Sequence, residues 1–472
     1  MKRLKVWFAS SEAAPFAKTG GLADVAGSLP KALKGLGVDI RVVMPKYRQI
    51  DPQYVSEMEF IGSCTIDLSW RKQYCGVYKL ESNGVPFYFI DNEYYFFRDG
   101  FYGLYDDGER FSFFCKAILE ILPVIDFQPD VIHLNDWQTG MASLLLDAEY
   151  RARDDFYKNM LTLFTIHNLR YQGIFPKSIL GELLDLDWKY FNMNGVEFYG
   201  QVNFLKAGLV YSSALSTVSR TYADEIRYDF FGEHLQNIIR QRSGDMHGIV
   251  NGIDYELNDP ETDARIYENF SISDLSGKDE NKKRLQQDLG LDIKEDVPLV
   301  SVISRLVDQK GFDLIERMLP ELMNLGIQFV VLGTGESRYE EMFRYAQNHY
   351  PGKLSANIKY DAVLAQRIYA GSDIFLMPSL YEPCGLSQLF SMRYGTVPVV
   401  RETGGLKDTV VPYNVYTKEG TGFTFANYNA HEMKDAVSRA VEIHKNQEEW
   451  ENLVRRCMEQ DFSWSSSAKQ YK

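Results

Sequence analysis

The stretch that decides the fold is Leu4-Lys5-Val6-Trp7-Phe8-Ala9, followed by the loop residues Lys18-Thr19-Gly20-Gly21 and a helical pattern over Leu22–Leu36. A short apolar run before a glycine-containing loop predicts a buried strand. Gly37 ends the helix, and Val38–Met44 is the next apolar run. This order of strand, helix and strand is that of a βαβ unit, so we expect a mainly parallel sheet.

The same alternation continues along the chain, which predicts an α/β fold. Further strands are expected at Val85–Ile90, Val131–Leu134, Leu161–Ile166, Leu215–Val218, Pro298–Ser304, Gln328–Leu332, Asp373–Met377 and Val397–Val400. Apolar residues between Phe312 and Leu325 recur at helical spacing. Asp259–Asp296 is charged and weakly periodic, and we interpret it as a connector with a helix near Lys282–Leu289.

We therefore expect two Rossmann-like doubly wound domains, joined near Asn251-Gly252-Ile253 and facing a cleft. Residues 1–250 form the first domain and residues 251–450 the second. Residues 451–472 are expected to form a helix that returns to the first domain.

The aromatic segment Tyr94–Phe114 leaves two readings open. Its rings either fill the edge of the core or form a surface that faces a sugar or a protein partner, because flat rings stack on apolar faces.

Composition and charge exclude several classes of function. Hydrophobic residues make up 45% of the 472 residues, which excludes wholesale disorder. With 51 basic and 65 acidic residues the net charge is −14, which disfavours nucleic acid or an anionic membrane as a partner. The five cysteines lack Cys-x-x-Cys spacing, and no apolar stretch approaches the length of a membrane helix. We expect a reduced, cytoplasmic setting.

Polar and glycine residues follow the predicted strands, where parallel sheets bind ligands. These candidate site residues are Lys18, Gly20, Gly21, Asp136, His167, Asn168, Arg305, Lys310, Glu382, Cys384, Gly385 and Thr403.

These residue types fit a phosphate and a sugar. Glycine lets backbone N–H groups approach an anion, and Lys18, Arg305 and Lys310 supply charges for a diphosphate. The carboxylates of Asp136 and Glu382 suit sugar hydroxyls or positive charge at an anomeric carbon.

Structural roles remain open for the same residues. The three cations can be solvated surface groups, and Glu382 can be a solvated loop acid. Asp136 can cap the helix through Met141–Leu146, and His167 can be a core histidine. Cys384 is expected to contribute backbone or packing, because no base lies beside it in the sequence.

Two cofactor classes receive little support. Gly333-x-Gly335 lacks the third glycine of a dinucleotide motif, since Arg338 stands there. The seven histidines show no metal-ligand spacing, so we expect neither a metal nor another cofactor.

Longer blocks of sequence resemble the bacterial glycogen synthase and plant starch synthase family. They cover nearly the whole chain in order: Lys18–Val25, His133–Gln138, His167–Gly173, Thr217–Ser219, Asn251–Asp254, Ser304–Gly311, Pro378–Gln388, Thr403–Leu406 and Asp461–Trp464. Departures are Leu257, where the family usually has tryptophan, and an end at Lys472, short of the usual tail; both concern domain closure.

This resemblance implies a GT-B fold and a metal-free retaining glucosyltransferase. Glucose would pass from ADP-glucose to the non-reducing end of glycogen or another α-1,4-glucan. The family pattern assigns Lys18, Arg305 and Lys310 to the diphosphate, with Gly20 and Gly21 in the loop that approaches it. Residues implied at the glucosyl site are His167, Asn168, Glu382, Cys384, Gly385 and Leu386, with Asp136 by the glucose or acceptor and Tyr360 by the base.

Two rival functions keep the same fold. A sugar-nucleotide hydrolase or epimerase would act without a glucan acceptor. A non-catalytic carbohydrate-binding or regulatory protein would not need Lys18, Arg305, Lys310 and Glu382 together.

Overall fold

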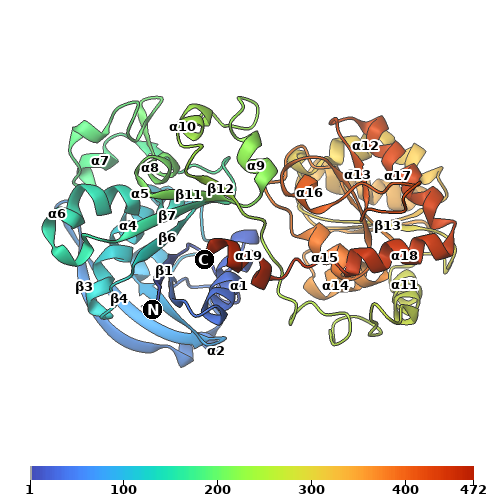
Figure 1. The fold of residues 1–472 in the computed structure, drawn as a ribbon, viewed down its shortest axis with the longest axis horizontal. Helices are drawn as coiled ribbons and strands as arrows, with labels where there is room; N and C mark the ends of the chain where they lie inside the picture. Colours follow the sequence, from blue (N-terminus) through green and yellow to red (C-terminus); the bar gives the residue numbers. More distant parts are fainter. Residues whose placement is uncertain (1–2) are drawn as a thin grey trace. The chain divides into compact units, whose positions relative to one another are not determined.

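The computed structural model describes residues 3–472, which fold into two compact units (Figure 1). One unit runs up to Asn251 and also contains Trp464–Lys472. The other unit is Gly252–Ser463. Each unit has its own sheet and its own hydrophobic core.

The first unit is built on a nine-stranded sheet in the order β12-β11-β7-β6-β1-β2-β5-β4-β3. Its seven parallel strands are β1 (Lys5–Ala9), β2 (Asp39–Pro45), β5 (Val85–Asp91), β6 (Val131–Asn135), β7 (Leu161–Ile166), β11 (Ala214–Thr217) and β12 (Met246–Gly248). The strand order reverses between β1 and β6, which is the topological switch point of a doubly wound sheet. All six strands predicted for this half of the chain are present.

The antiparallel edge of this sheet is absent from the prediction. Strands β3 (Glu59–Leu68) and β4 (Arg71–Ser82) form a long hairpin that pairs with β5. Most β3 side chains are partly or fully exposed, so its sequence lacks the apolar run that marks the buried parallel strands. A separate small sheet joins β8 (Ile174–Pro176), β10 (Gln201–Asn203) and β9 (Glu197–Phe198).

Helices cover both faces of the first sheet. They are α1 (Gly21–Gly35), α2 (Pro52–Glu57), α3 (Glu93–Phe96), α4 (Asp107–Val124), α5 (Trp137–Leu145), η1 (Leu146–Tyr150), α6 (Arg151–Arg153), η2 (Asp155–Tyr157), α7 (Ile179–Glu182), η3 (Trp188–Tyr190), α8 (Phe204–Tyr211), α9 (Arg220–Glu225), α10 (Gln236–Gln241) and α19 (Trp464–Tyr471). In Figure 1 the red α19 lies beside the blue α1, and the residues of these two helices are in contact.

The aromatic segment Tyr94–Phe114 belongs mainly to the core. Tyr95 and Phe96 in α3 are fully buried. So are three aromatic residues of α4, Phe111, Phe113 and Phe114. Tyr94, Phe97 and Tyr105 are exposed, so a minority of the rings face solvent.

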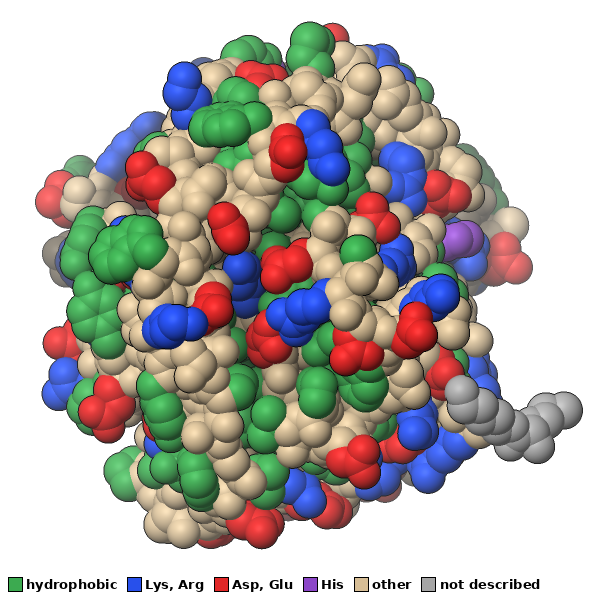
Figure 2. Space-filling view, turned by 90° about the vertical axis from the view of Figure 1, so that its left-hand side faces the viewer, with side chains coloured by type: hydrophobic (Ala, Val, Ile, Leu, Met, Phe, Trp, Pro, Cys, Tyr) green, Lys and Arg blue, Asp and Glu red, His purple; other side chains and the backbone are tan. Residues whose placement is uncertain are grey.

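The surface of this unit mixes charges of both signs. Figure 2 shows the side on which β3 and α6 lie in Figure 1, and there acidic and basic side chains are interspersed with apolar ones. Charges of both signs are therefore mixed on this face, which shows no single acidic field.

The second unit has a six-stranded parallel sheet in the order β15-β14-β13-β16-β17-β18. Its strands are β13 (Leu299–Ile303), β14 (Gln328–Leu332), β15 (Leu354–Asn357), β16 (Ile374–Met377), β17 (Val397–Arg401) and β18 (Phe423–Phe425). The order reverses between β13 and β16, so the fold is again doubly wound, as predicted. Its helical segments are α11 (Ser276–Asp288), η4 (Asp308–Lys310), α12 (Phe312–Met323), α13 (Ser337–His349), α14 (Ala362–Gly371), α15 (Ser387–Arg393), α16 (Gly404–Thr409), α17 (Ala430–His444) and α18 (Gln447–Met458).

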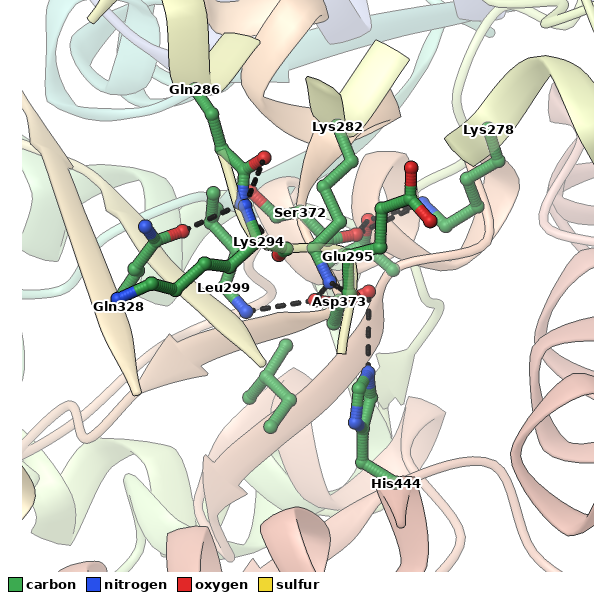
Figure 3. Close-up of polar contacts among 12 residues, drawn as sticks. Lys278, Lys282, Gln286, Lys294, Glu295, Leu299, Gln328, Ser372, Asp373 and His444 are labelled. Atoms are coloured by element: carbon green, nitrogen blue, oxygen red, sulfur yellow. Dashed lines mark hydrogen bonds and ion pairs between the residues drawn. The ribbon is translucent and has the colours of Figure 1, made fainter. Parts of the chain in front are cut away.

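A buried network of charges holds α11 against this sheet (Figure 3). The Lys278 ammonium donates to the carbonyl oxygens of Ala370, Ser372 and Tyr394 and to Thr396 Oγ1, at 2.9–3.0 Å. Burial lowers the pKa of Lys278 to about 8. The predicted connector therefore contains a helix, as expected, but α11 begins earlier, at Ser276, and packs into this unit because its lysines find partners there.

Asp373 is the centre of the adjoining contacts. Its Oδ2 lies 2.8 Å from Lys282 Nζ and accepts a hydrogen bond from Leu299 N at 2.7 Å, while Oδ1 lies 3.6 Å from His444 Nε2. Burial alone raises the pKa of Asp373, but Lys282 and His444 outweigh burial and hold it below its usual value. Asp373 therefore joins α11, α17 and the start of β13 just before β16 begins.

Replacing Asp373 with asparagine is expected to destabilise the second unit by about 3–5 kcal/mol, because the variant leaves the Lys282 ammonium buried without its counter-charge. Urea unfolding followed by circular dichroism measures the loss. Glu442→Gln, which removes an exposed ion pair to Lys445, is the control and should cost less than about 1 kcal/mol. Equal effects of the two variants would show that the buried network adds no stability.

Candidate functional site

In the first unit, a buried glutamate holds the loop that follows β1. Glu12 accepts hydrogen bonds from Thr19 N at 2.5 Å, from Thr19 Oγ1 at 2.6 Å and from Tyr102 Oη at 2.7 Å. These bonds hold the Lys18–Gly21 loop against the buried Glu12 side chain. Glu12 was not among the predicted site residues, because a single acid eight residues past a strand start carries no motif of its own.

The loop presents a cation and an open helix end. Lys18 is about half exposed and forms an ion pair with Asp24 Oδ1 at 2.6 Å. Gly20 stands at the N-cap position of α1, and a side chain there would meet no atom within 4 Å. The backbone N–H groups of Gly20 and Gly21 therefore lie where an anion can approach the start of α1.

Asp136 connects β6 with the loop after β7. It precedes α5, but its side chain forms no capping bond there, so the capping role considered above is wrong. Its Oδ1 accepts a hydrogen bond from His167 N at 2.7 Å. The backbone has φ +57° and ψ −177°, a conformation that costs a non-glycine residue about 1–3 kcal/mol. Burial raises the pKa of Asp136 to about 7.

His167 is neutral and its tautomer is fixed. Asn135 Nδ2 donates to the Ala9 carbonyl oxygen at 3.0 Å, so Asn135 Oδ1 is the atom that faces His167 Nε2 at 2.9 Å. Nε2 must then carry the proton, which leaves Nδ1 as an acceptor. Burial lowers the pKa of His167 to about 3. The half-buried Asn168 follows, and its Oδ1 accepts from Arg170 N at 3.1 Å.

Asn135 and Asn251 complete this edge of the sheet. Asn135 orients His167, as described above. Asn251 is 5% exposed, and among the described residues nothing bonds its buried Oδ1. Both lie inside quoted sequence blocks, yet the type asparagine alone did not single them out.

In the second unit, Lys310 and Glu382 meet at the carboxyl ends of β13 and β16. Lys310 Nζ lies 2.6 Å from Glu382 Oε2, and Ser379 Oγ donates to the same oxygen at 3.1 Å. Glu382 is buried, so it is not a solvated loop acid. Arg305 is exposed, and its side chain has no hydrogen bond or ion pair within the described part of the chain.

The Glu382–Leu386 loop rests on the backbone of the Thr403–Gly405 loop. Gly405 N donates to the carbonyl oxygens of Glu382 and Pro383 at 3.1 and 3.2 Å. A Cβ at Gly404 would lie 1.9 Å from the Glu382 carbonyl oxygen, and one at Gly405 would lie 2.0 Å from that of Cys384. Both glycines are thus required by contact between two loops, a reason that the sequence pattern did not reveal.

The remaining predicted residues flank these loops. Cys384 and Thr403 are buried, Gly385 has φ +73°, and Leu386 precedes α15. Tyr360 lies on the separate loop between β15 and α14 and is 84% exposed. A small pocket at the switch point of the sheet is lined by Ser304, Lys310, Pro378, Ser379 and Ser387, among others.

Gly333-x-Gly335 has a structural role. A Cβ at Gly333 would lie 1.8 Å from the Ser304 carbonyl oxygen, so the loop after β14 packs directly on the loop after β13. Within residues 3–472, no group of three His, Cys, Asp or Glu side chains is placed to hold a metal ion. None of the helices described there has both the length and the apolar character of a membrane crossing.

Comparison with known proteins gives family matches for both units. Residues 5–241 match the starch synthase catalytic domain family, and residues 284–456 match glycosyl transferases group 1. A glycogen synthase of Clostridioides difficile (strain 630) is 51% identical over 472 residues, which is 99% of this chain and 98% of the relative. A glycogen synthase of Geobacillus stearothermophilus is 51% identical over 469 residues, covering 99% and 96%.

Solved structures agree with the sequence matches. The catalytic domain of starch synthase IV from Arabidopsis thaliana, bound to ADP and acarbose, is 35% identical with a TM-score of 0.93, covering 100% of this chain and 98% of that one. Sucrose-phosphate synthase from Thermosynechococcus elongatus, 17% identical with a TM-score of 0.62, covers 99% and 97% and shares the fold. Together with the two doubly wound units, these matches show a glycosyltransferase of the GT-B class. More narrowly, the chain belongs to the glycogen synthase and starch synthase family.

Asp136→Asn is expected to stabilise the protein at pH 8. The folded-state pKa of Asp136, about 7, lies above its unfolded value near 3.9, so ionisation on raising the pH through this window costs stability. The variant removes that cost and keeps an acceptor for His167 N. Its gain in melting temperature should grow from pH 4 to pH 7 and then level off. A gain that is equal at pH 4 and pH 8 would contradict the raised pKa.

Proposed function

We propose that this chain transfers glucose from ADP-glucose to the non-reducing end of an α-1,4-glucan such as glycogen, with retention of configuration. The observation that carries the proposal is the Lys310–Glu382 pair beside the exposed Arg305, at the switch point of the second sheet. Support also comes from relatives with the name glycogen synthase and from the starch synthase IV structure that holds ADP and acarbose.

The diphosphate of the donor is assigned to three cations. Arg305 offers a planar fork and Lys310 a point charge at the carboxyl end of β13. Lys18 and the N–H groups of Gly20 and Gly21 are the corresponding groups of the first unit. Positive charge here stabilises the ADP anion as it departs, because charge develops on the leaving phosphate oxygen. Tyr360, with its exposed ring, is assigned to the nucleotide base.

The glucosyl group is assigned to polar side chains with fixed orientation. Neutral His167 accepts a hydrogen bond from a sugar hydroxyl at Nδ1, since Nε2 donates to Asn135 Oδ1. Glu382, Asn168 and the backbone of Cys384, Gly385 and Leu386 are assigned to the other sugar hydroxyls. The buried Thr403 is on the loop that packs against Glu382–Leu386. Asp136 is assigned to the glucose or the acceptor, and its pKa of about 7 leaves it partly protonated near neutral pH.

Retention is assigned to attack on the same face from which ADP departs. Glu382 is a buried acid assigned to the glucosyl group, but its Oε2 is already bound by Lys310 and Ser379. This is the environment of an electrostatic partner rather than of a free nucleophile. Trapping of a covalent glucosyl-Glu382 adduct would overturn this assignment.

We infer a cytoplasmic setting from the thiols. All five cysteines are free, and four of them are buried. Structural disulfides are characteristic of oxidising compartments, whereas free thiols are typical of proteins in the reducing cytoplasm.

The direct experiment is release of ADP from ADP-glucose with glycogen present, run beside UDP-glucose. We expect release that requires the glucan, together with growth of the glucan chain. Release without an acceptor would favour a hydrolase. No release under conditions in which a known glycogen synthase works would contradict the proposal.

Arg305→Ala should lower kcat/KM for ADP-glucose by about 10²–10³ and leave the melting temperature unchanged, because Arg305 is exposed and unpaired among the described residues. It is a cleaner probe than Lys310→Ala, which also leaves Glu382 buried without its partner. Arg317→Ala, an exposed arginine on α12, is the matched control. Normal kcat/KM in Arg305→Ala would exclude Arg305 from the phosphate site.

A further inference from the structure

An unusual hairpin turn lies in the first unit. Strands β9 and β10 are joined by Tyr199-Gly200, with Phe198 and Gln201 paired across the turn. Tyr199 has φ +51° and Gly200 has φ +79°. A two-residue turn with both φ values positive favours Asn-Gly or Asp-Gly, because bulky side chains are strained in the left-handed region.

The Tyr199 ring is not held there by burial. It is 73% exposed, so it contributes little to the core. A residue that strains the backbone and yet stays in solvent is more consistent with a functional than with a structural requirement.

The ring meets a second strained segment. Tyr199 Oη lies 3.4 Å from His234 Nδ1, and the two rings are 5.6 Å apart at 81°. His234 is exposed and has φ +65°, and Glu233 before it has φ +45°. Tyr199, Glu233 and His234 all have left-handed backbone conformations, and two of them carry the exposed rings that are in contact. We call Tyr199 and His234 the aromatic platform.

The aromatic platform is tied to the loop of His167 and Asn168. Gln172 Nε2 donates to the Glu233 carbonyl oxygen at 2.9 Å. Gln172 Oε1 accepts from Asn203 Nδ2 at 2.6 Å, and Asn203 lies in β10. Both halves of the platform are thus anchored to the same buried glutamine, five residues beyond His167.

We propose that the aromatic platform is a subsite for the glucan acceptor, where Tyr199 stacks on a sugar unit away from the reacting end. The inference rests on the proposed function. Pyranose rings present apolar C–H faces that aromatic rings cover well, while His234 offers a polar atom beside them. The anchoring through Gln172 holds the platform in a fixed position relative to His167, which the proposal above assigns to the glucosyl group.

The test separates the ring from the backbone strain. Tyr199→Asn removes the ring but suits φ +51°, so its melting temperature should be equal to or above that of the wild type. Its KM for maltoheptaose should rise about three- to tenfold, the size of an aromatic stacking contact. KM for ADP-glucose and for a short acceptor, maltose, should stay within twofold. Tyr199→Phe keeps the ring and should retain the wild-type KM.

Tyr345→Ala is the matched control. Tyr345 is 72% exposed and also stacks on a histidine, His349, but it lies in the regular helix α13 of the second unit. This variant should leave every kinetic constant unchanged. The subsite is refuted if Tyr199→Asn has the wild-type KM for maltoheptaose, or if it lowers the melting temperature and weakens all substrates equally.

A binding measurement keeps this inference distinct from the proposed function. Titration of maltoheptaose onto the wild type and onto Tyr199→Asn, followed by calorimetry, needs no turnover. If the wild type releases no ADP but Tyr199→Asn binds maltoheptaose more weakly than the wild type does, the proposed reaction is contradicted and the subsite is supported. If ADP is released and both proteins bind maltoheptaose equally, the subsite is wrong and the reaction stands.

Discussion

Parallel pairing of strands is the constraint on which the rest of this molecule depends. Because β1 pairs in parallel with both β2 and β6, all three strands end at the same edge of the first sheet. The same holds for β13 with β14 and β16 in the second. At each switch point the loops that follow the two neighbouring strands run to opposite faces of the sheet. A crevice is therefore left at the strand ends, where polar side chains can lie. Glu12 and Asp136 occupy one such point, and Lys310 and Glu382 the other.

Two of the three cations at these edges form ion pairs with carboxylates. Lys18 is paired with Asp24 and Lys310 with Glu382, whereas Arg305 has no carboxylate partner among the described residues. This arrangement lowers the cost of burying Lys310 and fixes its position. It also means that an incoming anion competes with a carboxylate for Lys310, whereas Arg305 is open to it from the start. An acidic chain can in this way keep a local positive site without an extended basic surface.

The sequence predicts ten of the thirteen parallel strands, because each of the ten is a short apolar run between turn residues. It misses the parallel strands β12, β15 and β18, which have only three or four residues each. It does not reveal β3 and β4, whose side chains alternate between a partly buried and an exposed face without a clear apolar run. Most candidate site residues were found because they follow predicted strands. Glu12 was missed, since its role depends on Tyr102, ninety positions away, and on Thr19. The strained backbone of Asp136 and the tautomer of His167 arise from neighbours in other strands, which no local pattern encodes.

The chain leaves the first unit at Asn251 and returns to it only with α19. Trp464 and Ala468 of that helix are buried, Ser467 Oγ donates to the Val250 carbonyl oxygen, and Lys472 Nζ donates to that of Leu36. During synthesis the residues up to Asn251 therefore emerge first but stay without their closing helix until the whole second unit has been made. The part of the protein that is translated earliest is the last to be completed, so a ribosome that stops shortly before Trp464 releases a chain whose exposed apolar surface lies on the first unit, not on the second.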